Sequence, residues 1–164
     1  FINKKFIFNP LQYFTFSKEC LDNCSNLLLK NNIYNNYEGI HLRMGDSKMN
    51  STKKNQFDNR VKNLNFHNTI DKIVSSKIDT IFLLFTDNKQ IKTEIFEKFD
   101  NIRILNIEII HTSECYNNKF QKNLKDNISE FVLLSKAKKI HSISYSGYPI
   151  VASWIYSNPL VKYY

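Results

Sequence analysis

The sequence predicts an α/β fold in which helices cover both faces of a parallel sheet. Segments with helical apolar spacing alternate with short apolar segments along the chain, an order typical of parallel strands joined by right-handed crossovers. The clearest strand, residues 80–86 (TIFLLFT), is apolar on both faces, as a central strand of such a sheet must be. We therefore expect a three-layer α/β domain.

The first third of the chain contains one predicted helix, one strand and one loop. Ser17 is placed to cap a helix over residues 17–30, whose apolar stripe consists of Cys20, Cys24, Leu27 and Leu28. Residues 38–43 form a short strand. Residues 47–65 contain several lysines and no periodic apolar face, which predicts a long polar loop.

The central strand 80–86 lies between two predicted helices. Residues 66–77 place Ile70, Ile73 and Val74 on one helical face. Residues 89–99 repeat this spacing through Ile91, Ile95 and Phe99, and residues 101–105 follow as another strand.

The last part of the chain repeats the helix and strand order. Residues 121–138 predict a longer helix with Ile128, Phe131, Val132 and Leu134 inward, followed by a strand over 139–144. A final helix ends near residue 156, and Pro149 is expected at its first position, where no backbone N–H is required.

Length and composition limit the classes of protein that this chain can represent. A chain of 164 residues without a repeat or linker is about one domain, so we expect a single domain over residues 1–164. Phe and Tyr total 22 residues, which excludes a largely disordered chain, and the longest aliphatic and aromatic run of five residues is far too short to cross a bilayer. Because the chain opens with Phe1, we expect a piece of a longer protein.

Glycine, cysteine and charge exclude several common sites. The three glycines, at positions 39, 45 and 147, do not provide a dinucleotide or phosphate loop. Cys20, Cys24 and Cys115 lack zinc or redox spacing, so we expect buried thiols. The net charge of +8 favours an anionic partner, although most lysines are scattered among asparagines.

Polar residues follow three predicted strands, where ligands of α/β sheets bind. The strand ends are residues 41–46 (HLRMGD), 86–88 (TDN) and 144–148 (SYSGY). His41 and Arg43 alternate onto the same side of their strand. The planar fork of Arg43 suits a diphosphate. Gly45 permits a sharp turn after the strand.

Each of these residues also has a structural interpretation. His41 is alternatively a buried core histidine, and Asp46 a residue of the turn. Arg43 is alternatively an internal ion-pair partner of Asp46 or Asp87. Ser146 can receive an anion together with the free N–H groups of the following helix, or simply cap that helix; these two roles are compatible.

The same residues resemble the motifs of a known family. Residues 39–46 (GIHLRMGD) are similar to the H-x-R-x-G-D motif of the fucosyltransferase superfamily, which includes α-1,2-, α-1,6- and protein-O-fucosyltransferases. Thr86-Asp87-Asn88 resembles its second motif, and residues 146–153 (SGYPIVAS) resemble its S-S-F-S-x-x-A segment. The resemblance covers about residues 37–155.

This resemblance implies the C-terminal, GDP-sugar-binding half of an inverting GT-B glycosyltransferase, with a Rossmann-like fold. Arg43 would bind the β-phosphate of GDP-fucose and stabilise the departing diphosphate. His41 and Asp87 would contact the guanine or its ribose. The residues implied around the nucleotide sugar also include Gly45, Ser144, Ser146 and Gly147. The acceptor would be a glycan or protein hydroxyl, and neither a metal nor another cofactor is expected.

Departures from the family motifs leave other functions open. Met44, Asn88, Gly147 and Pro149 replace residues that are usual in the family. The general base is Asp46, a residue beyond the loop, or a group outside this chain. A catalytically inactive nucleotide-sugar-binding or interaction module is the alternative. A specific nucleic-acid-binding domain is disfavoured because the aromatic residues fall at core positions.

Overall fold

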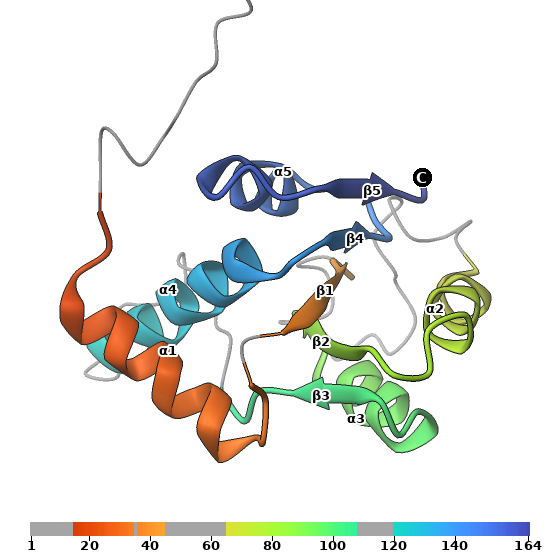
Figure 1. Cartoon of the computed structure of the whole chain (residues 1–164), viewed down its shortest axis with the longest axis horizontal. Helices are drawn as coiled ribbons and strands as arrows, with labels where there is room; N and C mark the ends of the chain where they lie inside the picture. The colour runs from red at the N-terminus through yellow and green to blue at the C-terminus, as the bar shows by residue number, and fades with distance from the viewer. Residues whose placement is uncertain (1–14, 35, 45–64, 108–119) are drawn as a thin grey trace, which may run out of the picture.

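A computed structural model of the chain describes residues 15–34, 36–44, 65–107 and 120–164, with side chains from residue 124 onward in the last segment. Within these segments, five strands form one sheet in the order β3-β2-β1-β4-β5, and every neighbouring pair is parallel. Figure 1 shows α2 and α3 on one side of the sheet and α1 and α4 on the other. The predicted three-layer α/β fold is confirmed.

The predicted elements are present to within about two residues at most ends. The helices are α1 (Lys18–Lys30), α2 (Phe66–Ser75), α3 (Lys89–Lys98), α4 (Phe120–Lys136) and α5 (Gly147–Ile155). The strands are β1 (Tyr37–Leu42), β2 (Ile81–Thr86), β3 (Ile102–Ile104), β4 (Ile140–Ser142) and β5 (Leu160–Lys162). Sequence analysis did not predict β5. None of the helices in the described segments has the length and apolarity to span a bilayer.

Two apolar clusters, one on each face of the sheet, form the core. Ile40 and Leu42 of β1 pack with Ile70 of α2 and Ile91 of α3. The cluster on the opposite face contains Cys24 and Leu28 of α1, Leu133 of α4 and Ala152 of α5. Residues of β1 alternate between these clusters, as the period of two in a strand requires.

Gly39 lets α4 approach β1 closely. A Cβ atom at this position would lie 2.9 Å from Leu134 Cδ1 and 3.2 Å from Ala137 Cβ, closer than ordinary van der Waals contact. His41 lies on the same side of β1 as Gly39, and Arg43 follows directly after the strand. A helix packed against Gly39 therefore also lies beside the end of β1.

Three expectations differ from the structure or fall outside it. Ile128 is 40% exposed rather than inward. The final helix begins at Gly147 and is capped by Ser146, so Pro149 occupies its third position and not its first. The predicted loop over 47–65 lies outside the described residues, apart from Asn65, whose side chain caps α2.

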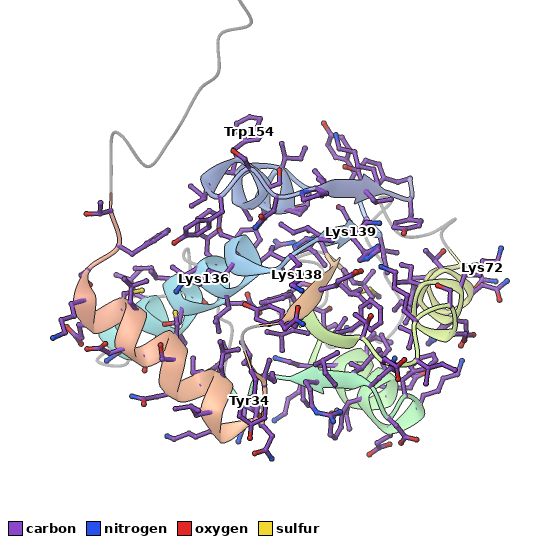
Figure 2. The ribbon with its side chains drawn as sticks, viewed as in Figure 1. Tyr34, Lys72, Lys136, Lys138, Lys139 and Trp154 are labelled. Carbon is purple, nitrogen blue, oxygen red and sulfur yellow. The ribbon has the colours of Figure 1, made fainter. Side chains whose placement is uncertain are left out.

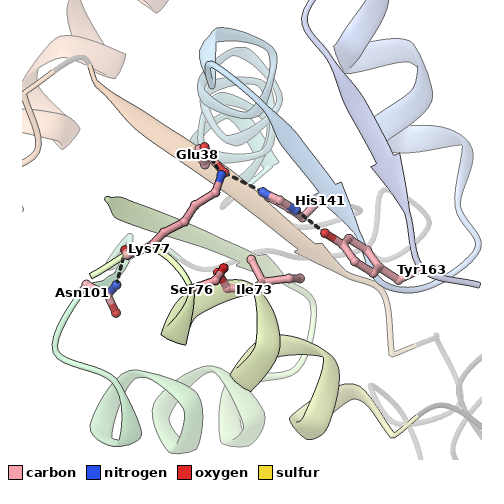
Figure 3. A network of polar contacts seen from close by, with 7 residues as sticks. All are labelled: Glu38, Ile73, Ser76, Lys77, Asn101, His141 and Tyr163. Carbon is pink, nitrogen blue, oxygen red and sulfur yellow. Dashed lines mark hydrogen bonds and ion pairs between the residues drawn. The ribbon is translucent and has the colours of Figure 1, made fainter. Parts of the chain in front are cut away.

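A polar network joins β1, β4 and the C-terminal segment (Figure 3). His141 Nε2 lies 2.6 Å from Glu38 Oε2, and His141 Nδ1 lies 2.8 Å from the hydroxyl of Tyr163. Lys77, which follows α2, donates to the same carboxylate at 2.7 Å. Both polar atoms of the nearly buried His141 ring therefore have partners, so the network accounts for this histidine structurally.

Candidate functional site

The polar residues predicted at the strand ends meet at one edge of the sheet. Strands β2 and β3 lie on one side of β1, and β4 and β5 on the other, so the strand order reverses at β1. Leu42 pairs with Thr86 in β2, and His41 pairs with Ser142 in β4. The carboxyl ends of β1, β2 and β4 therefore form the topological switch point at which α/β sheets bind ligands.

Arg43 is held at this edge by an ion pair with Asp87. Its Nε lies 3.1 Å from Asp87 Oδ2, and the other oxygen of Asp87 accepts a 2.8 Å hydrogen bond from the backbone N–H of Met44. The side chain of Asp87 is only 5% exposed, whereas that of Arg43 is 26% exposed. The carboxylate thus fixes the guanidinium while leaving it accessible from solvent.

Ser144 fixes the backbone of the same arginine. The hydroxyl of Ser144 accepts a 2.6 Å hydrogen bond from the backbone N–H of Arg43, and the Ser144 carbonyl accepts one of 3.1 Å from Ser142 Oγ. Ser144 is fully buried. In this structure its side chain connects the end of β4 to the end of β1, an arrangement that positions Arg43.

His41 is buried beside an aromatic residue of α5. Its ring stacks on Tyr148 with centroids 5.6 Å apart, and within the described residues its Nδ1 has no hydrogen-bond partner. Burial, reinforced by the positive charge of Arg43, lowers the pKa of His41 to about 3. The imidazole is therefore neutral at physiological pH, with one N–H donor and one acceptor nitrogen.

Ser146 and Gly147 lie where β4 leads into α5. The Ser146 hydroxyl caps the helix by accepting a 3.3 Å hydrogen bond from the backbone N–H of Tyr148. Gly147 is exposed, and a Cβ atom added there would meet nothing within 4 Å. The remaining predicted site residues, Gly45 and Asp46, lie outside the described residues.

Two buried charged residues near the strand ends were missed by sequence analysis. Glu130 of α4 and Lys92 of α3 are only 7% and 8% exposed. Burial raises the pKa of Glu130 to about 7, assisted by Asp87 and opposed by Lys92 and Arg43. Burial likewise lowers the pKa of Lys92, against the effect of Glu130. Helical spacing was the available signal, because buried Leu133 and Leu134 lie three and four residues after Glu130, and buried Ile95 lies three residues after Lys92.

The shifted pKa values of His41 and Glu130 have opposite effects on stability. The unfolded state binds the His41 proton below pH 6.5 and the folded state only near pH 3, so this group lowers stability as the pH falls between these values. Folded Glu130 binds its proton at about pH 7 and the unfolded state at 4.5, so it raises stability as the pH falls through that range. Between pH 4.5 and 6.5 the two groups oppose each other.

Comparisons with known proteins identify the fold. No protein-family model and no curated protein matches the chain. A solved structure of NodZ α-1,6-fucosyltransferase co-crystallised with GDP matches 87% of this chain and 43% of its own, with a TM-score of 0.57 at 14% identity. The chain has a fucosyltransferase-like fold. NodZ soaked with GDP-fucose matches 88% of the chain, with a TM-score of 0.57 at 13% identity.

The fucosyltransferase-like fold extends over most of this chain but over less than half of its structural neighbours. NodZ from Bradyrhizobium matches 87% of the chain and 43% of its own length, with a TM-score of 0.54 at 13% identity. The likeness confirms the expected resemblance in fold to part of a GT-B fucosyltransferase.

Proposed function

We propose that this chain is the donor-binding half of a fucosyltransferase and binds the diphosphate of GDP-fucose at the carboxyl edge of β1, β2 and β4. The observation that carries the proposal is Arg43. It stands at the switch point of a fucosyltransferase-like fold, with its guanidinium fixed by Asp87 and its backbone fixed by Ser144. The NodZ neighbours were crystallised with GDP and soaked with GDP-fucose, which supports the choice of nucleotide.

The local chemistry suits an anionic diphosphate. A guanidinium keeps its charge at any working pH and donates parallel hydrogen bonds to phosphate oxygens. The α5 N-terminus adds the positive end of a helix dipole, and the space around Gly147 leaves room for ligand atoms. The Tyr148 N–H is taken by the Ser146 cap, and Pro149 has no N–H to offer. Neutral His41 adds a hydrogen-bonding edge without a competing charge.

In the proposed reaction, an acceptor hydroxyl on a glycan or protein attacks the anomeric carbon of fucose from the face opposite GDP. The acceptor hydroxyl gives its proton to a general base, for which Asp46 is one candidate. The bond from the anomeric carbon to the diphosphate oxygen breaks, and GDP leaves with the electron pair. Arg43 stabilises the charge that develops on the departing diphosphate, which is the largest electrostatic contribution we assign to this chain. Asp87 and Ser144 act as positioning residues for Arg43. We propose that this step needs no metal.

Binding, rather than turnover, tests this proposal, because the chain spans 43% of the NodZ structure. Calorimetric titration with GDP, UDP and CDP should give the tightest binding for GDP. Arg43→Lys keeps the charge but loses the fork, and we expect it to weaken GDP binding by about tenfold or more. The matched control is Arg103→Lys, on β3, whose side chain donates, among the described residues, to the backbone carbonyls of Asp100 and Ile102. Equal GDP affinity in the chain and in Arg43→Lys would contradict the proposal.

A second candidate is a nucleotide-sugar-binding module without catalysis. The observation favouring it is that the chain matches less than half of each NodZ structure. The two candidates differ in turnover. Incubation of the chain, and of any longer protein that contains it, with GDP-fucose and acceptor glycans should release GDP if the first candidate is correct. Retained GDP affinity with no GDP release from the longer protein would favour the module.

A further inference from the structure

A pocket of about 550 Å³ lies beside the C-terminal end of α5. Among the described residues, it is lined by Ser153 and Trp154 of α5 and by Ser157 and Asn158 of the following turn. Helix α5 has nine residues and rises about 1.5 Å per residue, so the pocket lies about 13 Å along the helix from the Ser146 cap. The pocket is therefore separate from the Arg43 edge.

Trp154 supplies an apolar surface to this pocket. It is 54% exposed, and Val151, three residues earlier and on the same side of the helix, is 43% exposed. The opposite side of α5 buries Ala152 and Ile155 in the core. Figure 2 shows Trp154 projecting away from the rest of the molecule. The indole is thus available to a ligand without any rearrangement of the core.

The turn after α5 supplies fixed polar groups. Asn158 donates from its backbone to the Ser153 carbonyl at 2.9 Å and from Nδ2 to the Ser135 carbonyl at 2.7 Å, which holds its side-chain amide in place. Within the described residues, neither Asn158 Oδ1 nor the Ser157 hydroxyl has a hydrogen-bond partner. Ser157 has a backbone φ of 55°, in the left-handed region that few residues other than glycine adopt readily. Ser157 is one of the residues that line the pocket.

Ser153, Trp154, Ser157 and Asn158 carry no charge, so these described lining residues offer no ion-pair partner to a phosphate or carboxylate. A wholly apolar ligand would cover the Ser157 hydroxyl and the Asn158 oxygen without replacing their bonds to water. A neutral sugar matches both properties, because one face of its ring presents C–H groups and its edge presents hydroxyls. An aromatic surface with a few placed polar groups is the usual composition of a small-ligand site.

We propose that this pocket binds a neutral saccharide, with one sugar ring on Trp154 and sugar hydroxyls on Ser157 Oγ and Asn158 Oδ1. The inference does not rest on the proposed function, because it concerns other residues and requires no nucleotide.

The sequence provides a specific probe, since Trp154 is its only tryptophan. Titration of the chain with maltotetraose, cellotetraose and tetra-N-acetylchitotetraose, without GDP, should give with at least one of them a saturable shift of tryptophan emission to shorter wavelength. A hyaluronan tetrasaccharide, which is charged, should give no saturable shift. The absence of a saturable shift with all three neutral sugars, or an equal response to the charged one, overturns the proposal.

Two variants and one control assign the contacts. Ser157→Gly suits the left-handed backbone, so the fold is retained while the hydroxyl is lost, and sugar affinity should fall about threefold to tenfold. Trp154→Ala should abolish saturable binding measured by calorimetry. Tyr34→Ala removes another exposed aromatic residue, 75% exposed and before β1, and should leave affinity unchanged. Unchanged affinity in both Ser157→Gly and Trp154→Ala refutes the assignment.

Discussion

The ion pair between Arg43 and Asp87 gives Arg43 a part in stability beside its proposed part in nucleotide binding, and the two effects can be separated by experiment. Exposed ion pairs contribute about 0–1 kcal/mol, whereas loss of one partner of a buried pair costs about 3–5 kcal/mol. With side chains 26% and 5% exposed, this pair lies between the two cases. We expect Arg43→Ala to lower the free energy of unfolding by about 2 kcal/mol, equivalent to about 4–8 °C in Tm.

A double-mutant cycle in urea measures the interaction directly. Arg43→Ala, Asp87→Ala and the double variant should give a coupling free energy of about 1–2 kcal/mol. The exposed pair of Lys98 and Asp71, with atoms 2.9 Å apart and side chains 48% and 38% exposed, is the matched control and should couple by less than about 0.5 kcal/mol. GDP affinity of folded Arg43→Ala is measured in the same buffer and should fall by about tenfold or more. Equal coupling in the two pairs would refute the structural reasoning, and normal GDP affinity in folded Arg43→Ala would refute the binding role.

Three further substitutions test other parts of the structure. Glu130→Gln removes the carboxyl whose protonation offsets the loss of stability caused by His41 as the pH falls. Urea titrations of this variant should therefore show a steeper loss of unfolding free energy from pH 6.5 to 5 than those of the unchanged chain. Parallel pH profiles for the two proteins would count against the buried carboxyl. Ser144→Ala leaves the Arg43 N–H without its acceptor and should cost about 1–3 kcal/mol in urea unfolding, with weaker GDP binding; an unchanged midpoint would argue against this contact. Gly39→Ala forces a Cβ atom against Leu134 and Ala137, so it should lower the free energy of unfolding by about 1–3 kcal/mol. A variant more stable than the unchanged chain would show that α4 can move away from β1 without loss of stability.

Sequence patterns predicted the helices and strands well where apolar residues repeated at helical or strand spacing over many positions. Strand 80–86 is apolar on both faces, and β2 is indeed an interior strand between β1 and β3. Strand β5 (Leu160–Lys162) was missed because it is an edge strand without a fully buried residue, so its sequence shows neither an apolar run nor alternation. Ile128 was placed inward by helical spacing, but it is 40% exposed, whereas the next two residues of α4, Ser129 and Glu130, are buried.

The candidate site was predictable only in part. Alternation within a strand placed His41 and Arg43 on one side, and the parallel order placed Asp87 and Ser144 at the same edge. Sequence alone could not show whether Arg43 forms an ion pair, because this depends on the distance between its guanidinium and a carboxylate. In the structure Arg43 Nε lies 3.1 Å from Asp87 Oδ2. Glu130 and Lys92 were missed because charged residues within a helix are ordinarily assigned to solvent.

The hydrogen bond from the Arg43 backbone to Ser144 has a consequence for how the site forms. It joins residues 101 positions apart, and β1 pairs with β4 across a similar separation. Contacts between such distant residues close large loops, and their entropy cost must be met before they stabilise the chain. During synthesis, β1, β2 and β3 emerge long before β4, and the edge that fixes Arg43 is incomplete until residue 144 has left the ribosome. If the chain binds GDP as proposed, that affinity would appear only in the last stage of folding, and it would report that the whole sheet has assembled.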